Sequence, residues 1–202
     1  MSVIEIQKIW RGYLQRKMNK KLCDFFTINM VIEYIDFFNR SILFIDEMNK
    51  KLKNEKVIRL PNYPSEITEN IVKFAICKGT GFMPNWNTKK GDLVLLNKQI
   101  EVKGSVDLLN GGPSSFGPTE NWDIIYFIDC VNSIKKEFKI WKINLSNTSD
   151  EWKQIKVNKN ETYYDQCLKG RRPRINFPKI IGQIPKKFVS IIFDGHINSL
   201  IF

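Results

Sequence analysis

The chain has 202 residues, which is the size of one domain or of one domain with a terminal appendage. Hydrophobic residues make up 43% of it and include 14 Phe and 5 Trp, which argues against intrinsic disorder and predicts a packed core. The 32 Lys and Arg outnumber the 21 Asp and Glu and give a net charge of +11, which favours a polyanionic partner, either nucleic acid or an anionic membrane surface.

Residues 3 to 22 are the first expected helix. Residues 6–16 fit the I-Q-x-x-x-R-G-x-x-x-R pattern of IQ motifs, which bind calmodulin or myosin light chains through a basic amphipathic helix. The apolar residues also have the spacing of a helix that packs on its own domain. The basic side chains Arg11, Arg16 and Lys17 could instead lie along DNA phosphates. We favour a helix that packs on the core or flanks DNA over a calmodulin-like partner.

A long helix is expected from Ile28 to about Lys53, because apolar residues recur there at steps of three and four. These residues are Met30, Tyr34, Phe37, Phe38, Ile42, Ile45 and Met48. We interpret this helix as scaffold and as a candidate part of a dimer interface. The two helices would form an N-terminal helical segment, residues 1–56, packed on a core of residues 57–202.

Another helix is expected after Pro64, with Ser65 as its N-cap. Its expected buried stripe consists of Ile67, Ile71, Phe74 and Ala75. Glu66 and Glu69 lie three residues apart on its flank, so both could face the segment that follows. Favourable interaction with the helix dipole would by itself account for both carboxylates.

Residues 91–105 are the stretch around which the chain is organised. The apolar runs Leu93–Leu96 and Ile100–Val102 flank the turn-like residues Asn97–Gln99, which predicts a β-hairpin. Glu101 and Lys103 are two residues apart and therefore point to the same face of the second strand. Because unpaired buried charge is costly, this pair calls for an explanation.

Asp92, at the start of the first strand, can join Glu101 and Lys103 in one group. Two carboxylates and an ammonium are what a hard cation and a polarised water require. The alternative is that Glu101 and Lys103 only pair with each other on an exposed face.

Asp92, followed after eight residues by Glu101-Val102-Lys103, resembles the D-x(n)-(D/E)-x-K signature of the PD-(D/E)XK nucleases. Gly91 stands where this family classically has a proline. The helix upstream and the Gly-, Ser- and Pro-rich segment downstream extend the likeness to small type II restriction endonucleases. It covers roughly Pro64 to Phe177.

This resemblance implies a restriction-endonuclease-like core of the α/β (α+β) class, with a mixed sheet of about four to six strands flanked by helices. It implies Mg²⁺-dependent cleavage of double-stranded DNA at a short specific site, with Asp92, Glu101 and Lys103 as catalytic residues. A small type II enzyme would act as a homodimer on a two-fold symmetric site. The implied metal ligands are Asp92, Glu101, the carbonyl of Val102, and Glu69 in preference to Glu66.

Two later segments are candidates for DNA contact. Ser114 and Ser115 belong to a Gly-, Ser- and Pro-rich loop after the second hairpin strand, where they could meet a phosphate or a groove edge. Arg171, Arg172 and Arg174 flank a proline, and the planar fork of arginine suits a phosphate or the guanine edge. A solvated basic loop is the alternative for the arginines.

The cysteines, the histidine and the apolar stretches bear on which cofactors the protein could bind and on where in the cell it resides. The four cysteines form no Cys-x-x-Cys pair and His196 is the single histidine, so we expect no zinc site and reduced thiols in an intracellular protein. No stretch has the form of a signal peptide or approaches the roughly 20 apolar residues of a membrane span. We therefore expect a soluble, cytoplasmic protein without a membrane partner.

Two other functions remain as alternatives. A repair or recombination nuclease of the same fold would cut branched or damaged DNA instead of giving discrete bands from a linear duplex. A non-enzymatic IQ-motif protein would bind a calmodulin-like partner in a calcium-dependent way and leave DNA intact.

Overall fold

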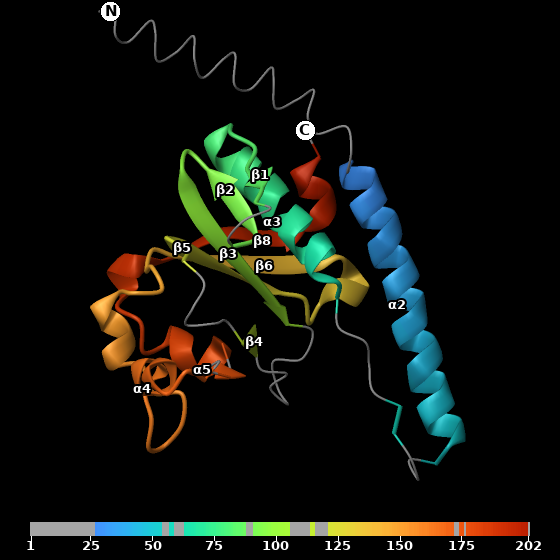
Figure 1. The fold of residues 1–202 in the computed structure, drawn as a ribbon. Helices are drawn as coiled ribbons and strands as arrows, with labels where there is room; N and C mark the ends of the chain where they lie inside the picture. Colours follow the sequence, from blue (N-terminus) through green and yellow to red (C-terminus); the bar gives the residue numbers. More distant parts are fainter. Residues whose placement is uncertain are drawn as a thin grey trace, which may run out of the picture.

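The computed structural model of the chain describes residues 27–53, 57–58, 63–87, 91–105, 114–115, 121–171, 174–175 and 177–201. A six-stranded sheet with the order β1-β2-β3-β5-β6-β8 lies at its centre (Figure 1). β3 and β5 are parallel and the other neighbouring strands are antiparallel, so the sheet is mixed. Its strands are β1 (Asn85–Trp86), β2 (Leu93–Leu95), β3 (Lys98–Ser105), β5 (Ile124–Asp129), β6 (Glu137–Ile143) and β8 (Val189–His196). The predicted fold class is confirmed.

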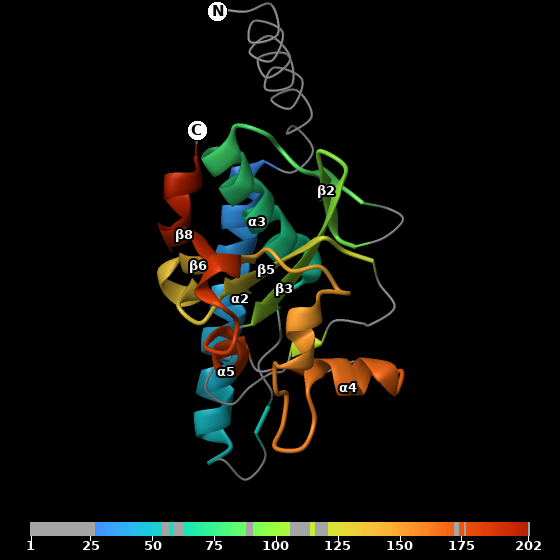
Figure 2. The ribbon, with the colours of Figure 1, turned by 90° about the vertical axis from the view of Figure 1, so that its left-hand side faces the viewer.

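Helices cover both faces of this sheet (Figures 1 and 2). The α-helices are α2 (Ile28–Lys51), α3 (Ser65–Thr80), α4 (Tyr163–Leu168) and α5 (Phe177–Ile181). The short 3-10 helices are η2 (Ser133–Lys135), η3 (Asp150–Lys153), η4 (Lys186–Phe188) and η5 (Ile197–Leu200). A separate two-stranded sheet pairs β4 (Ser114–Ser115) with β7 (Arg174–Ile175). No helix in the described part of the chain is long and apolar enough to cross a membrane.

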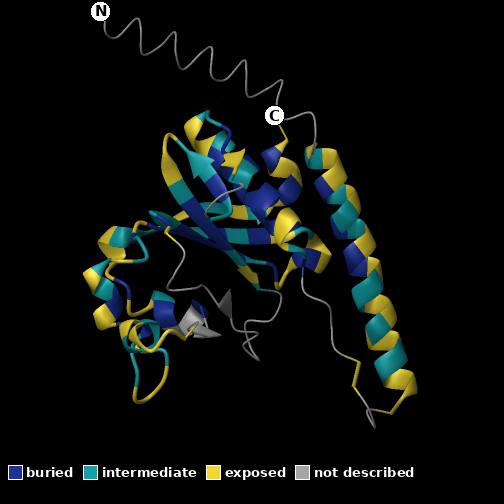
Figure 3. Cartoon of the chain, in the orientation of Figure 1, coloured by how far each residue is buried: buried dark blue, intermediate teal, exposed yellow. Residues whose placement is uncertain are grey.

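The sheet separates two hydrophobic cores, because side chains alternate between its faces. On one face Ile100 and Val102 of β3 pack with residues of α2 and α3. On the other face Ile125 and Phe127 of β5 pack with η3, α4 and α5. β5 is buried from Ile125 to Ile128, and α3, which packs on the sheet, is buried from Ile67 to Val72 (Figure 3). Glu101 and Lys103 are the register neighbours of Ile125 and Phe127, so they belong to the second face.

The long helix predicted from Ile28 is present as α2, but its predicted apolar stripe combines two different sides. The side that packs on the core contains Val31, Ile35 and Phe38. Met30 and Phe37, which the sequence pattern placed in the same stripe, are exposed. The pattern was ambiguous because α2 carries apolar residues on both sides. The IQ-like helix predicted for residues 3–22 lies outside the described residues.

Two predicted boundaries are corrected. α3 begins at Ser65 itself, and Pro64 occupies the N-cap position without a side-chain hydrogen bond, so Ser65 is not the cap. The predicted hairpin is present, but its turn is formed by Leu96 and Asn97, both with positive φ, of 50° and 64°. Such angles match the twist of a two-residue hairpin, and leucine gives no sequence signal for them.

Candidate functional site

The β2–β3 hairpin positions the predicted catalytic residues at one edge of the long strand β3. β2 pairs with β3 from Leu93 opposite Ile100 to Leu95 opposite Lys98, so the second half of β3 extends beyond its partner. Asp92 lies where β2 begins, and its backbone N–H donates to the carbonyl of Ile100, 3.0 Å away. The Asp92 side chain therefore reaches the part of β3 that β2 leaves uncovered.

Gly91 explains why the proline of the family signature is absent here. Its φ is +69°, whereas the proline ring fixes φ near −65°. An added Cβ at Gly91 would also lie 3.1 Å from the carbonyl oxygen of Ile100. The tight approach of the two strands before Asp92 thus favours glycine over any other residue.

The structure brings Asp92, Glu101 and Lys103 together, as predicted. Lys103 Nζ forms an ion pair with Glu101 Oε1 and lies 3.7 Å from Asp92 Oδ2. The same Asp92 oxygen accepts a hydrogen bond of 2.6 Å from the backbone N–H of Val102. The side chain of Glu101 is 1% exposed, whereas those of Lys103 and Asp92 are 21% and 23% exposed. The ammonium and one carboxylate can therefore meet a ligand from solvent while the second carboxylate is fixed behind them.

Glu69 extends this charged group from α3. Its pKa is raised to about 8, first by burial and then by the nearby charges of Asp92, Glu66 and Glu101, while Lys103 lowers it. Glu69 is buried and Glu66 is exposed, and the charges that act on Glu69 include those of Asp92, Glu101 and Lys103. Burial and the neighbouring carboxylates together therefore disfavour the ionised form of Glu69 more than the Lys103 ammonium favours it.

The oxygen atoms of Asp92, Glu101, Glu69 and the Val102 carbonyl are of the chemical type that binds a hard divalent cation. Carboxylate and carbonyl oxygens are the ligands that Mg²⁺ prefers, and an added cation would favour the ionised form of Glu69, whose pKa is raised by burial and by the nearby carboxylates. Within the described ranges, however, no three His, Cys, Asp or Glu side chains are already arranged as a metal-binding group. The side chains would have to reorient around the ion, and Lys103 would have to give up part of its contact with the carboxylates.

The two predicted DNA-binding segments lie side by side. β4 pairs antiparallel with β7, with Ser114 opposite Ile175 and Ser115 opposite Arg174. The backbone of the serine segment, which follows β3 in the chain, is thus joined to the backbone of the arginine segment, although the two lie far apart in sequence. Arg172 lies outside the described residues.

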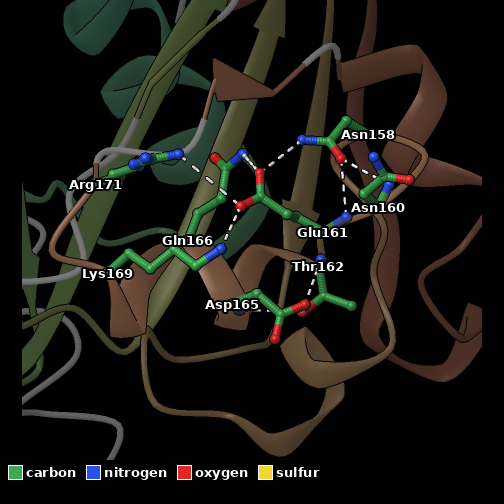
Figure 4. Close-up of polar contacts among 8 residues, drawn as sticks. All are labelled: Asn158, Asn160, Glu161, Thr162, Asp165, Gln166, Lys169 and Arg171. Carbon is green, nitrogen blue, oxygen red and sulfur yellow. Dashed lines mark hydrogen bonds and ion pairs between the residues drawn. The ribbon is translucent and has the colours of Figure 1, made fainter.

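A polar cluster that the sequence analysis missed holds the start of the arginine segment (Figure 4). Glu161 accepts hydrogen bonds from Lys169 at 2.7 Å and from Asn158 and Gln166 at 3.0 Å. These three bonds, that of Lys169 foremost, hold the pKa of Glu161 at about 2. Arg171 Nη1 lies 3.9 Å from the same carboxylate. The hub could not be found from sequence, because no spacing rule links Glu161 to residues beyond the next helix.

Helix α4, which lies between Glu161 and Lys169, is fixed at its start by a capping box. Thr162 Oγ1 accepts from the backbone N–H of Asp165, and Asp165 Oδ2 accepts from the backbone N–H of Thr162. Such a box satisfies two backbone donors that a helix start leaves open. The six-residue α4 is therefore held at both ends, by this box and by the Glu161 hub, and Arg171 follows directly after it.

Comparison with known proteins identifies the family of the chain. The model of the Bsp6I restriction endonuclease family matches residues 33–184, which include both the hairpin and the arginine segment. The type II restriction enzyme Bsp6I of Bacillus sp. (strain RFL6) is 35% identical over 137 residues, which are 67% of this chain and 73% of that protein. The chain belongs to the Bsp6I restriction endonuclease family. The prediction of a type II restriction endonuclease is confirmed.

A second family model matches the N-terminus of this restriction endonuclease. It is the IQ calmodulin-binding motif, over residues 1–17, in agreement with the pattern found in the sequence. This match ends before the restriction endonuclease match begins at residue 33. No solved structure matches the chain. The partner of the IQ-like residues therefore stays an open prediction.

Proposed function

We propose that this endonuclease hydrolyses phosphodiester bonds of double-stranded DNA at a short specific site, with Mg²⁺ as cofactor and with Asp92, Glu101 and Lys103 as catalytic residues. The observation that carries the proposal is the convergence of two carboxylates on the Lys103 ammonium at the open edge of β3. A structural ion pair would need only one carboxylate, whereas cleavage of a phosphodiester needs oxygen ligands and a cationic group at one place.

The proposed ligands of the cation are the side chains of Asp92, Glu101 and Glu69 and the carbonyl of Val102. Bound Mg²⁺ would supply positive charge next to the phosphate oxygens and favour a hydroxide-like water. Lys103 would orient the attacking water and donate a hydrogen bond to the phosphate, because its ammonium is partly exposed beside both carboxylates. Val102 fixes Asp92 through its N–H and so keeps the two strands of the hairpin in register at the reacting group.

The test is digestion of a sequenced plasmid with and without Mg²⁺, followed by sequencing of the fragment ends. Discrete ends that appear only with the cation are expected from wild type. Asp92→Ala, Glu101→Ala and Lys103→Ala should each abolish cleavage, and double variants should be little worse than single ones, because the three groups act as a unit. Robust cleavage by Lys103→Ala would refute the assignment. Cleavage only of branched or damaged DNA would instead favour the repair nuclease.

We further propose that Arg171, Arg172 and Arg174, with Ser114 and Ser115, contact DNA and that at least one arginine reads a guanine. Support comes from the pairing of β4 with β7, which places the two segments together next to the catalytic strand. Phosphate contacts are the same at every site, so sequence must be read by groups of fixed geometry at base edges. The β-pairing and the Glu161 hub supply such geometry on either side of the arginines.

Replacement of one arginine by lysine keeps the charge and removes the fork. For an arginine that reads guanine, cognate binding should weaken by about 1–3 kcal/mol while binding to a random duplex and its salt dependence stay nearly unchanged. Binding of each variant to cognate and random duplexes, measured in parallel over a range of salt concentrations, makes the comparison. Equal losses on both duplexes for all three variants would make this segment a phosphate clamp.

We propose that two copies act together on a two-fold symmetric site, because the two strands of a palindrome present the same sequence to identical subunits. We also propose the division into an N-terminal helical segment, residues 1–56, and a nuclease core, residues 57–202. α2 shares one hydrophobic core with α3 and β3, which supports a segment that is packed on the nuclease core and not a separate unit.

A further inference from the structure

The outer side of α2 carries a row of exposed apolar side chains. Met30, Phe37 and Phe44 are 46%, 59% and 63% exposed and follow one another at intervals of seven residues. Seven residues are nearly two helical turns, so the three side chains form one line along the helix. Tyr34 lies beside this line, with its ring centroid 6.3 Å from that of Phe37. Side chains of this size and exposure, in line on one helix, mark a binding surface for another protein.

A groove runs along this side of α2. Its volume is about 670 Å³, and it is lined by Glu33, Asp36, Asn39, Arg40, Leu43 and Ile134. Leu43 and Ile134 are themselves 56% and 51% exposed, so the groove continues the apolar surface toward η2. Asp36 pairs with Lys136 of its own chain at 2.7 Å, and Asn39 donates to the carbonyl of Ser133 at 2.8 Å. The wall of the groove that faces the core is therefore held in place.

The charges on this surface are complementary to the same surface turned around. Glu33 and Arg40 are exposed, lie seven residues apart in the groove and have opposite signs. When a second α2 lies antiparallel across a two-fold axis midway between them, Glu33 of one copy faces Arg40 of the other, and the reverse pair forms as well. The same axis brings Met30 of one copy next to Leu43 and Phe44 of its partner. A two-fold axis thus matches charges and apolar side chains together.

We infer that the outer side of α2 is the surface through which two copies of this chain associate, as an antiparallel pair of α2 helices. The inference names the contact surface of the proposed homodimer. It rests on the proposed function only for the reason why two copies would associate. α2 lies on the side of the sheet away from α4 and α5 (Figure 1), so this pairing leaves the arginine segment of both copies uncovered. Both copies of the segment would then remain accessible to one duplex.

The test uses full-length protein and sedimentation velocity without DNA. Wild type should sediment as a dimer. Glu33→Arg and Arg40→Glu each place two like-charged pairs across the axis and should weaken self-association roughly tenfold or more. When the two variants are mixed, one copy carries two positive and the other two negative residues at these positions, so both cross-axis pairs become complementary. The mixture should therefore form heterodimers, and the double variant Glu33→Arg/Arg40→Glu should dimerise by itself.

Restoration by mixing distinguishes a contact between copies from damage within one copy. Far-UV circular dichroism spectra of the Glu33 and Arg40 variants should match that of wild type, since neither residue is in the core. Phe37→Glu should abolish the dimer, whereas Ile191→Glu, an equally exposed apolar residue on β8, should leave it intact. A monomeric wild type, which residues 1–26 folded over this surface would produce, overturns the inference, and so do variants whose mixture stays monomeric.

The test of the dimer surface and the test of DNA cleavage can fail independently of each other. Cleavage with Mg²⁺ by a protein that dimerises through another surface would overturn this inference and leave the proposed function intact. A dimer restored by mixing, in a protein that cuts no DNA, would support the surface and refute the function.

Discussion

Glu69→Gln should change the pH dependence of stability in a way that few other substitutions can. In metal-free protein, the pKa of the buried Glu69 carboxyl is raised to about 8 from 4.5, by burial first and by Asp92, Glu66 and Glu101 after it. The folded state therefore keeps the proton through a pH range in which the unfolded chain has lost it. Because the folded pKa is the higher one, the stabilisation is complete below the unfolded pKa and is lost as pH rises toward about 8.

The size of this loss follows from the two pKa values. Each pH unit between them costs about 1.4 kcal/mol, so the unfolding free energy should fall by on the order of 4 kcal/mol between pH 5 and pH 9 from this group alone. Total stabilities are about 5–15 kcal/mol, so the effect is a large fraction of what holds the domain together. Glutamine has nearly the same shape and no proton to lose, so Glu69→Gln removes the pH-dependent part.

Urea unfolding of both proteins at pH 5, 7 and 9, in the presence of a chelator, measures the difference. At pH 5 wild type should equal or exceed the variant, and at pH 9 the variant should be the more stable protein. Subtraction of the two curves cancels the other groups that titrate. The exposed Glu66→Gln on the same helix is the matched comparison and should show a smaller effect in the same direction, since it removes only one of the charges that raise the pKa of Glu69. A difference between wild type and Glu69→Gln that is the same at pH 5 and pH 9 would refute the reasoning.

Addition of Mg²⁺ extends the same experiment to the proposed cofactor. A cation bound at Asp92, Glu101 and Glu69 should stabilise the folded state by RT ln(1 + [Mg²⁺]/Kd). It should also favour ionised Glu69, so at pH 8 it should stabilise wild type more than Glu69→Gln. Equal stabilisation of the two proteins would remove Glu69 from the proposed ligands without affecting Asp92 and Glu101.

Three further predictions concern other parts of the molecule. Gly104→Ala should cost about 1–3 kcal/mol in urea unfolding, because its Cβ would lie 2.8 Å from Thr68 Cγ2, and Thr68→Ser, which removes that methyl, should restore part of the loss. Glu161→Gln should lower the ratio of cognate to random DNA affinity, because Lys169 and Arg171 lose their contact with this carboxylate. Glu151→Gln, which removes the same charge near the same helix, should leave the ratio unchanged. Equal ratios for the two variants would show that Glu161 does not position the arginines. Reversal of Arg11, Arg16 and Lys17 to Glu should weaken DNA binding and flatten its salt dependence if the IQ-like helix lies along phosphates, and unchanged DNA binding with tight capture of calmodulin would assign the helix to the other partner.

The sequence was sufficient for the features that depend on local pattern. The hairpin, the shared face of Glu101 and Lys103 and the long α2 follow from periods of two and of three to four residues, and the structure contains them. The buried stripe of α3 follows in the same way, since its four predicted residues are all in the core. The pattern was less informative for α2, because a helix with two apolar sides does not reveal which one packs inward.

Features that depend on contacts distant in sequence could not be predicted. No local signal indicates that Ser114 pairs with Ile175, or that Glu161 gathers donors from both sides of α4. The positive φ of Leu96 is imposed by the twist of the strands it joins and not by any preference of leucine. The sequence also does not show that Glu69 is buried and Glu66 exposed, because this depends on how α3 packs on the sheet; the choice between them as metal ligand stays a prediction.

The pairing of β4 with β7 gives a physical reason for reading and cutting to depend on each other. β3, which carries the proposed catalytic residues Glu101 and Lys103, ends at Ser105, and Ser114 and Ser115 of β4 pair with the segment that carries Arg174. If the arginines read bases and Lys103 is catalytic, as proposed, a mismatch that displaces the arginines should also act on β4, which contacts β3. Since catalysis needs the ammonium and carboxylates within a fraction of an ångström of their places, a small displacement suffices to slow it. Specificity in this enzyme should thus be greater in cleavage than in binding, because a mismatched site loses base contacts once in affinity and again in the alignment of Lys103.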